Sequence, residues 1–177
     1  MGKLKNWLKA RYIGWDYDKY WSSREALFDP KTNKIKYFMC KSYVSKTNRR
    51  YAADIAYDVR GGKNFKGRPI LRHKLNGIVI AAGAIIGKKC YISHQVTIGR
   101  SKGEAPVIGD NVYIGPGAKI FGGIHIGNNV RIGANAVVFE DVPDNATVVL
   151  QKPRVIVKSS EYKYYVASKD ERDQDPK

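Results

Sequence analysis

The side chains best suited to chemistry in this sequence are three histidines and two cysteines: His73, His94, His125, Cys40 and Cys90. A neutral imidazole titrates near neutral pH, so each histidine could take a proton from a hydroxyl group. Two cysteines are too few for a disulfide framework or a zinc site by themselves. The histidines are 21 and 31 residues apart and provide no close pair of metal ligands. The sequence therefore predicts proton-transfer chemistry without a bound metal.

The positive charge of the chain is concentrated at its N-terminal end. The 177 residues include 32 Lys and Arg against 16 Asp and Glu, a formal net charge of +16, and residues 1–74 hold 19 of the basic and 6 of the acidic residues. Such a patch suits nucleic acid, an anionic membrane surface or a phosphorylated substrate. Because no nucleic-acid-binding module is recognisable, we predict no nucleic-acid partner and a peripheral contact with an anionic membrane.

The hydropathy pattern predicts where the protein works. The longest uncharged stretch, residues 75–87, is too short to span a membrane. The basic N-terminus has no continuous apolar segment of the kind found in secretory signals. We therefore predict a cytoplasmic protein, including the inner face of the membrane.

A six-residue period runs through the nearly neutral middle of the chain. The residue after each repeated aliphatic residue is usually Gly, Ala or Ser, and the period breaks once, at a polar loop over residues 100–106. This period matches neither a helix nor simple strand alternation. Short strands joined by tight turns account for it, with the aliphatic side chains in a narrow core. The repeated positions are Ile80, Ile86, Ile92, Ile98, Ile108, Ile114, Ile120, Ile126, Ile132 and Val138.

This repeat resembles that of the hexapeptide-repeat acyltransferases, whose chains coil as a left-handed parallel β-helix of triangular cross-section. The resemblance covers residues 55–156 and implies a mainly β fold in which each coil needs its neighbours to bury its core face. Residues 1–54 are predicted to form a small basic α-helical region, and residues 157–177 a polar tail.

Three helices are predicted in the N-terminal region. Apolar residues at helical spacing predict the first over Lys3 to Trp21. A capping box with Ser22 at the N-cap predicts a second, which ends at residues 29–30. The third is predicted over Lys34 to Val44.

The segment 58–80 resembles the catalytic edge of the serine acetyltransferase branch of that family. In that branch a histidine precedes a Gly-Ile-Val-Val rung and acts as general base, and an aspartate fifteen residues upstream orients its imidazole. Here His73 precedes Gly-Ile-Val-Ile at residues 77–80, and Asp58 lies fifteen residues before it. The resemblance implies direct acetyl transfer with His73 as base and Asp58 as its partner. His94, in the next rung, and Arg72 are predicted to contact the acceptor.

Two other reactive side chains receive no catalytic role. Cys90 falls on a core-facing position of the repeat, which favours a buried thiol over a nucleophile. His125 comes five residues after Ile120 and is predicted to point outward.

The resemblance also implies acetyl-CoA as the donor, bound in a groove between neighbouring subunits of a homotrimer. Pro116 stands where the family usually has Ala, and proline has no N–H to donate. The positions that match the donor-contacting turns are Gly115, Pro116, Gly117, Ala118, Gly133 and Ala134. The cations predicted to neutralise the phosphates are Lys119, Arg131, Lys152 and Arg154.

Two departures from the serine enzymes decide the predicted acceptor. Those enzymes carry Asp-Arg-His-Pro in the loop that holds the amino acid, whereas residues 102–106 read Lys-Gly-Glu-Ala-Pro. Arg72 also replaces the Asp that precedes their catalytic histidine. We predict transfer to a sugar hydroxyl of a cell-surface polysaccharide or its precursor.

Two alternatives remain open at this point: a serine O-acetyltransferase of cysteine biosynthesis and a non-catalytic β-helix scaffold. A γ-type carbonic anhydrase shares the β-helix, but the histidine spacing disfavours its zinc site.

Overall fold

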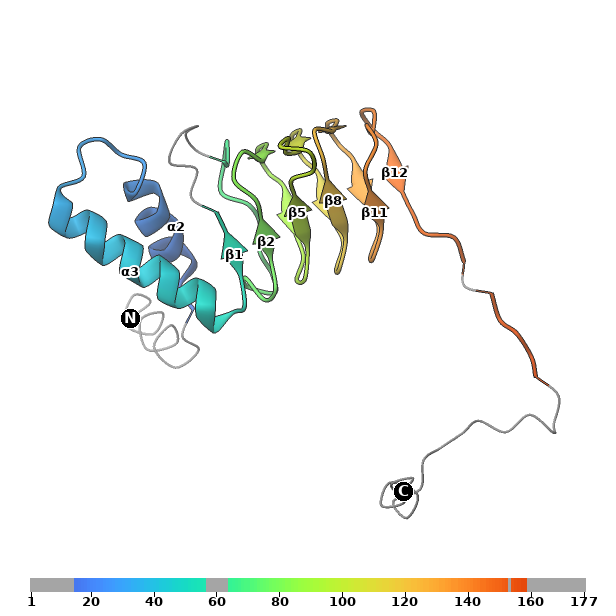
Figure 1. Cartoon of the computed structure of the whole chain (residues 1–177), viewed down its shortest axis with the longest axis horizontal. Helices are drawn as coiled ribbons and strands as arrows, with labels where there is room; N and C mark the ends of the chain where they lie inside the picture. Colours follow the sequence, from blue (N-terminus) through green and yellow to red (C-terminus); the bar gives the residue numbers. More distant parts are fainter. Residues whose placement is uncertain (1–14, 57–63, 153, 159–177) are drawn as a thin grey trace, which may run out of the picture.

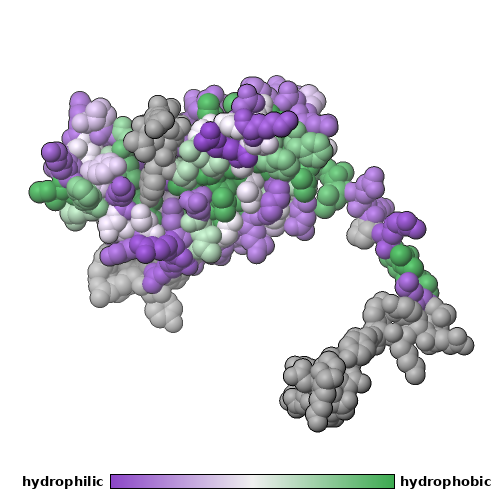
Figure 2. All heavy atoms as spheres, in the orientation of Figure 1, coloured by the Kyte–Doolittle hydropathy of each residue, from purple (hydrophilic) through white to green (hydrophobic). Residues whose placement is uncertain are grey.

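A computed structural model describes residues 15–56, 64–152 and 154–158 of the chain. Two helices, α2 (Tyr17–Ala26) and α3 (Lys34–Arg50), lie at one end of a parallel β-helix of short strands (Figure 1). After the last strand the chain leaves the body of the molecule as an extended segment (Figures 1 and 2). The prediction of a mainly β fold with helices in the N-terminal region is confirmed.

The coils of the β-helix contribute short strands to three parallel sheets. Sheet A contains, in sequence order, β1 (Asp54–Ile55), β2 (Val79–Ile80), β5 (Thr97–Gly99), β8 (Lys119–Phe121) and β11 (Val137–Val138). Sheet B contains β3 (Ile85–Ile86), β6 (Val107–Ile108) and β9 (His125–Ile126). Sheet C contains β4 (Tyr91–Ile92), β7 (Tyr113–Ile114), β10 (Arg131–Ile132) and β12 (Thr147–Val148).

The six-residue period of the sequence corresponds to one strand and one corner of the coil. Ile80 pairs in register with Ile98, and Ile98 with Ile120. The first interval is 18 residues and the second 22, so four residues are extra. They form a short antiparallel bridge between Ser101 and Glu104 at the corner between sheets A and B. The insertion therefore leaves the register of the core unchanged.

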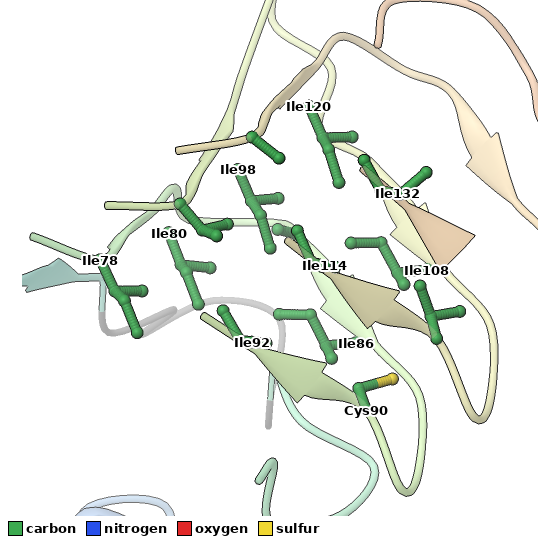
Figure 3. Close-up of a cluster of buried hydrophobic side chains, with 14 of the residues drawn as sticks. Ile78, Ile80, Ile86, Cys90, Ile92, Ile98, Ile108, Ile114, Ile120 and Ile132 are labelled. Carbon is green, nitrogen blue, oxygen red and sulfur yellow. The ribbon is translucent and has the colours of Figure 1, made fainter. Parts of the chain in front are cut away.

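Stacked isoleucines form the core of the β-helix (Figure 3). Ile80, Ile98 and Ile120 from sheet A are at most 1% exposed, and their counterparts in sheets B and C are buried as well. Each buried aliphatic side chain contributes roughly 1.5–3 kcal/mol relative to an exposed one. Because no coil can bury these side chains alone, the stability of the fold comes from stacking.

Left-handed backbone turns the chain at the corner between sheets B and C. Lys89, Asn111, Asn129 and Asn145 stack there with φ between 55° and 61°. Asparagine tolerates this conformation better than most residues with a side chain. The neighbouring Gly109 has no room for a Cβ, which would lie 2.8 Å from the carbonyl oxygen of Gly127. The repeat therefore needs small residues at these positions because the backbones of neighbouring coils pack closely there.

The predicted boundary between the first two helices at Ser22 is wrong. Ser22 lies inside α2, and Asp16 is the N-cap, with its carboxylate accepting the N–H of Lys19 at 2.9 Å. The Ser22 hydroxyl instead donates to the carbonyl of Asp18 at 2.7 Å, a bond that a serine inside a helix commonly makes. The part of the predicted first helix before residue 15 lies outside the described residues.

The helix predicted over Lys34 to Val44 is real but continues to Arg50. Asn33 caps its start by accepting the N–H of Lys36 at 2.9 Å. Val44 and Asn48 are buried on the same face, so the inward packing of α3 continues past the predicted end.

Buried polar side chains join the helices to the β-helix. The Tyr20 hydroxyl donates to the Asn48 side chain at 2.8 Å, which ties α2 to α3. Arg24 is only 2% exposed, and its guanidinium donates to the carbonyls of Ile55 and Ala56 at 3.1 and 2.6 Å. These bonds satisfy a buried cation and fix the helices against β1.

Candidate functional site

His73 and His94 lie together at the corner between sheets C and A. His73 sits in the turn between the bridge at Ile70 and β2, and His94 in the turn between β4 and β5. Their ring centroids are 4.8 Å apart, with ring planes inclined at 66°. Only the coiling of the chain brings these two residues side by side. We call this corner the histidine corner.

Backbone hydrogen bonds stack the histidine corner from coil to coil. Their N···O distances are 2.8, 3.1 and 2.8 Å, and they run from Gln95 to Asn76, from Gly117 to His94 and from Asn135 to Pro116. Each coil is thereby held against the next, and His94 lies above the turn that contains Pro116.

The backbone around His73 is fixed while its imidazole is exposed. Leu75, two residues on, is fully buried, and the N–H of Gly77 donates to the carbonyl of Tyr51 at 2.9 Å. The His73 side chain itself is open to solvent. A base that must reach a substrate hydroxyl needs this combination of fixed backbone and accessible ring.

Helix α2 holds the start of the segment that carries His73. The Tyr17 hydroxyl donates to the carbonyl of Pro69 at 2.8 Å. The Arg68 guanidinium makes two hydrogen bonds of 2.8 Å to the Glu25 carboxylate, and this pairing raises the pKa of Arg68. The pair is partly exposed, so its value lies in positioning more than in net stability.

His94 is half-buried, and its Nδ1 atom is buried without a hydrogen-bond partner among the described residues. Most buried polar atoms in proteins have a partner, and an exception calls for a reason. The ring contact with His73 places this unpaired nitrogen in the same corner as an exposed imidazole. The arrangement suits contact with a polar substrate group.

Asp58, the predicted partner of His73, lies outside the described residues, so the His73–Asp58 pair stays a prediction. Arg72 immediately precedes His73, and its side chain is exposed. A cation is therefore adjacent in sequence to the proposed base, and its role in acceptor binding also stays a prediction.

The small residues predicted to contact the donor lie at the histidine corner, in the coils that follow His94. The N–H groups of Gly115, Gly117 and Gly133 are already used inside the β-helix, at N···O distances of 2.8, 3.1 and 2.8 Å. Pro116 has no N–H. A Cβ on Gly115 would lie 2.7 Å from the backbone nitrogen of Ala134. A donor along this corner would meet close-packed backbone and side chains, because those three N–H groups are occupied and Pro116 has none.

Of the four cations predicted to bind phosphate, Lys119 lies at the histidine corner. Its Nζ donates to the carbonyl of Gln95 at 2.9 Å. The Arg131 guanidinium donates to the carbonyl of Asn111 at 2.7 Å, which directs it to the corner between sheets B and C. Lys152 and Arg154 are exposed on the segment after β12. Within one chain, the last three are not brought to the histidines.

Tyr51 is a residue of this site that the sequence did not reveal. Its carbonyl fixes Gly77, and its ring centroid is 5.5 Å from the Nζ of Lys74, next to His73. Burial raises the pKa of the Tyr51 hydroxyl. Tyr51 follows the last residue of α3, and no motif links it to a histidine 22 residues later.

The two residues without a predicted catalytic role are placed as expected. Cys90 is fully buried, and burial raises the pKa of its thiol, so its nucleophilic thiolate is disfavoured. His125 lies on the outward face of sheet B, away from the histidine corner.

In the part of the chain that the structure describes, no group of three or more His, Cys, Asp or Glu side chains could hold a metal ion. Across the same residues, no helix combines the length and apolarity needed to cross a bilayer.

Known proteins share the repeat and the fold. Residues 105–140 match the family described as bacterial transferase hexapeptide (six repeats). The chain is 47% identical over 87 residues to a serine acetyltransferase of Synechococcus elongatus, covering 47% of this chain and 36% of that protein. It is 30% identical over 136 residues to a serine acetyltransferase of Bacillus subtilis, covering 71% of this chain and 58% of that protein. A solved Neisseria gonorrhoeae serine acetyltransferase matches with a TM-score of 0.57 and 28% identity, covering 89% of this chain and 56% of that chain.

The chain spans about half the length of the curated relatives that it matches, 36% and 58% in these two cases. The similarities support the class of hexapeptide-repeat acyltransferases with a left-handed β-helix. The names of the relatives support the serine acetyltransferase branch and give no support to the polysaccharide branch predicted from the sequence.

Proposed function

We propose that this chain is an acetyl-CoA-dependent O-acetyltransferase whose general base is His73. The observation that carries the proposal is the exposed His73 imidazole on a fixed corner beside His94, in a β-helix similar to known acetyltransferases. A covalent acyl-enzyme is not required, and the buried Cys90 is a poor candidate for one.

The proposed reaction is a direct transfer. His73 accepts the proton of the acceptor hydroxyl as its oxygen attacks the thioester carbonyl of acetyl-CoA. An oxygen–carbon bond forms, the carbon–sulfur bond breaks, and the imidazolium returns the proton to the departing CoA thiolate. Asp58, by resemblance to the family, holds the imidazole in the correct tautomer and stabilises its charged form.

His94 is assigned to the acceptor. Its ring contacts that of His73, and its buried Nδ1 has no partner in residues 15–56, 64–152 and 154–158. Both observations support a hydrogen bond to the substrate close to the reacting hydroxyl. Such a bond would orient the hydroxyl toward the base, which contributes to rate by positioning.

The donor is assigned to the histidine corner below His94, where Lys119 supplies a cation for a CoA phosphate. Arg131, Lys152 and Arg154 lie elsewhere in the same chain, so their predicted contacts require a second subunit, as in the homotrimer implied by the resemblance. The trimer and the cytoplasmic location stay predictions.

L-Serine is the acceptor that the comparisons favour, because the relatives are named serine acetyltransferases. A serine substrate has a carboxylate, which needs a cationic partner. Arg72 is exposed beside His73 and has a guanidinium suited to a bidentate carboxylate contact.

A sugar hydroxyl is the second candidate, and the loop 100–106 favours it. Ser101 and Glu104 close the loop with two backbone hydrogen bonds of 2.9 and 3.0 Å, and the Arg100 guanidinium donates to Gly103 within it at 2.7 Å. The loop lies at the corner between sheets A and B, so sheet A separates it from His73 in the same chain. Because Arg100 is occupied inside the loop, and the loop is separated from His73 in the same chain, this loop does not supply a cation for a serine carboxylate.

Thiol release from acetyl-CoA tests the proposal. Purified protein is assayed with L-serine and, separately, with a panel of nucleotide sugars and oligosaccharides. Release with serine assigns the first acceptor, and release only with a glycan assigns the second. Failure to bind CoA in a thermal-shift assay, together with no release, favours the scaffold alternative.

The His73→Ala variant tests the assigned base. We expect a loss of roughly 10²–10⁴-fold in thiol release, the usual contribution of a general base. His125→Ala removes an exposed histidine from sheet B and is the matched control. Activity of His73→Ala close to that of the unmodified protein would contradict the assignment.

A further inference from the structure

Three large apolar side chains protrude from the first two turns of α3. Ile35, Phe38 and Met39 are 76%, 69% and 69% exposed. Their spacing of three and four residues places them on one face of the helix. Figure 2 shows hydrophobic atoms at the end of the molecule where α3 begins, next to hydrophilic residues. We call these three residues the apolar tip.

The apolar tip points away from the rest of the protein. Val44 and Asn48 lie on the inward face of α3. Val44 is fully buried, and the Asn48 side chain accepts a hydrogen bond from the Tyr20 hydroxyl of α2. On a helical projection, Ile35 and Met39 fall opposite these two residues. A cluster of exposed apolar side chains of this kind indicates a surface that another body covers.

Positive charge surrounds the apolar tip. Helix α3 carries six Lys and Arg and no Asp or Glu. Lys34, Lys36 and Lys41 are exposed in the same turns as the tip. Asp18 and Glu25 of α2 are engaged by Arg68 and so do not neutralise this surface. The surface thus combines protruding apolar side chains with a rim of cations.

We propose that the apolar tip docks on an anionic phospholipid surface. The apolar side chains enter the boundary between headgroups and acyl chains, and the lysines attract the anionic headgroups. A second copy of this chain is a poorer partner, because a two-fold contact would bring the lysines of one α3 against those of the other. The start of α3 lies at one end of the molecule, which suits contact with a flat surface (Figure 1). The inference does not depend on the proposed acetyl transfer.

Vesicle co-sedimentation of the full chain tests the proposal. Phosphatidylcholine vesicles with and without phosphatidylserine are compared at low salt. One variant, Phe38→Ser with Met39→Ser, removes apolar contacts. A second variant, with Lys34, Lys36 and Lys41 each changed to Glu, reverses the local charge. The matched controls are Phe139→Ser and a Lys88→Glu, Lys102→Glu variant, which change exposed residues of the β-helix.

We expect sedimentation only with phosphatidylserine, and partition about tenfold weaker in each α3 variant, because headgroup attraction and apolar insertion act together. The β-helix controls should bind like the unmodified chain. Three outcomes would overturn the proposal: no sedimentation, equal losses in the controls, or a lipid-free assembly that dissociates when the tip is changed. Far-ultraviolet circular dichroism confirms that each variant is folded.

Discussion

Two corners of this β-helix share a left-handed backbone but differ in what their side chains do. At the corner between sheets B and C, the Asn111 amide donates to Asn129 and the Asn129 amide donates to Asn145, at 2.9 and 3.0 Å. The positive-φ positions of the histidine corner include Gln95, Gly117 and Asn135. Among the described residues, no such side-chain ladder joins these three.

The residues just before the positive-φ positions show the same difference between the two corners. Asp110 accepts the N–H of Lys88 at 2.7 Å, and Asn128 accepts the N–H of Asp110 at 2.8 Å, so side chains of one coil hold the backbone of the next. The corresponding residues of the histidine corner include Pro116 and His94, whose Nδ1 has no hydrogen-bond partner within the described part of the chain. The first corner uses its side chains for stability, and the second leaves them available for a ligand.

Breaking the asparagine ladder should give the largest effect on stability. Asn129→Ala removes two amide hydrogen bonds worth about 1 kcal/mol each and places alanine in a left-handed conformation, for a total loss of about 3 kcal/mol. Asn135→Ala keeps only the backbone penalty of about 1 kcal/mol. Urea unfolding of both variants measures the difference, and equal losses would show that the ladder contributes nothing.

Changing His94 should affect substrate binding more than stability. We expect His94→Ala to raise KM for the acceptor about tenfold, the size of one hydrogen bond, with CoA affinity unchanged. Steady-state kinetics with the acceptor found by the thiol-release assay measures this, with His125→Ala as control. An unchanged KM would remove His94 from the acceptor site.

Removing Lys119 should give the smallest effect. Lys119→Ala is expected to weaken CoA binding about threefold, because a partly exposed cation contributes little, and added salt should reduce the difference. Isothermal titration with CoA measures it. Lys88→Ala is the matched control, since that exposed lysine lies at the corner between sheets B and C. If Lys88→Ala weakens binding more than Lys119→Ala, the donor lies along a different face.

The β-helix could be predicted because its signal is local and repeated. Each isoleucine of the six-residue period has a matching neighbour in the next coil, and every one of the repeated positions that was predicted to face the core is buried. The helix boundaries were less predictable. Ser22 has the residue pattern of a cap, but the competing cap at Asp16 starts the helix earlier.

The site was only partly predictable. His73 and the small residues of its corner were identified from a motif and a repeat. Tyr51 lies at the end of α3, far from any motif, and only the structure shows that its carbonyl accepts the N–H of Gly77. The directions of Lys119 and Arg131 also had to come from the structure. Both occupy outward positions beside a core isoleucine, and the pattern of the sequence does not distinguish the carbonyl that each side chain reaches.

By itself, the sequence determined the coiled architecture and the residues of its core, because both depend on residue type at a regular interval. The candidate base, His73, came from the resemblance of its segment to a family motif. The tertiary structure decided which distant residues meet. His73 and His94 are 21 residues apart, not the 18 of a regular coil, so counting alone does not align them. Their contact and the exposed tip of α3 arise from how complete coils and helices pack, since packing acts between elements far apart in the chain.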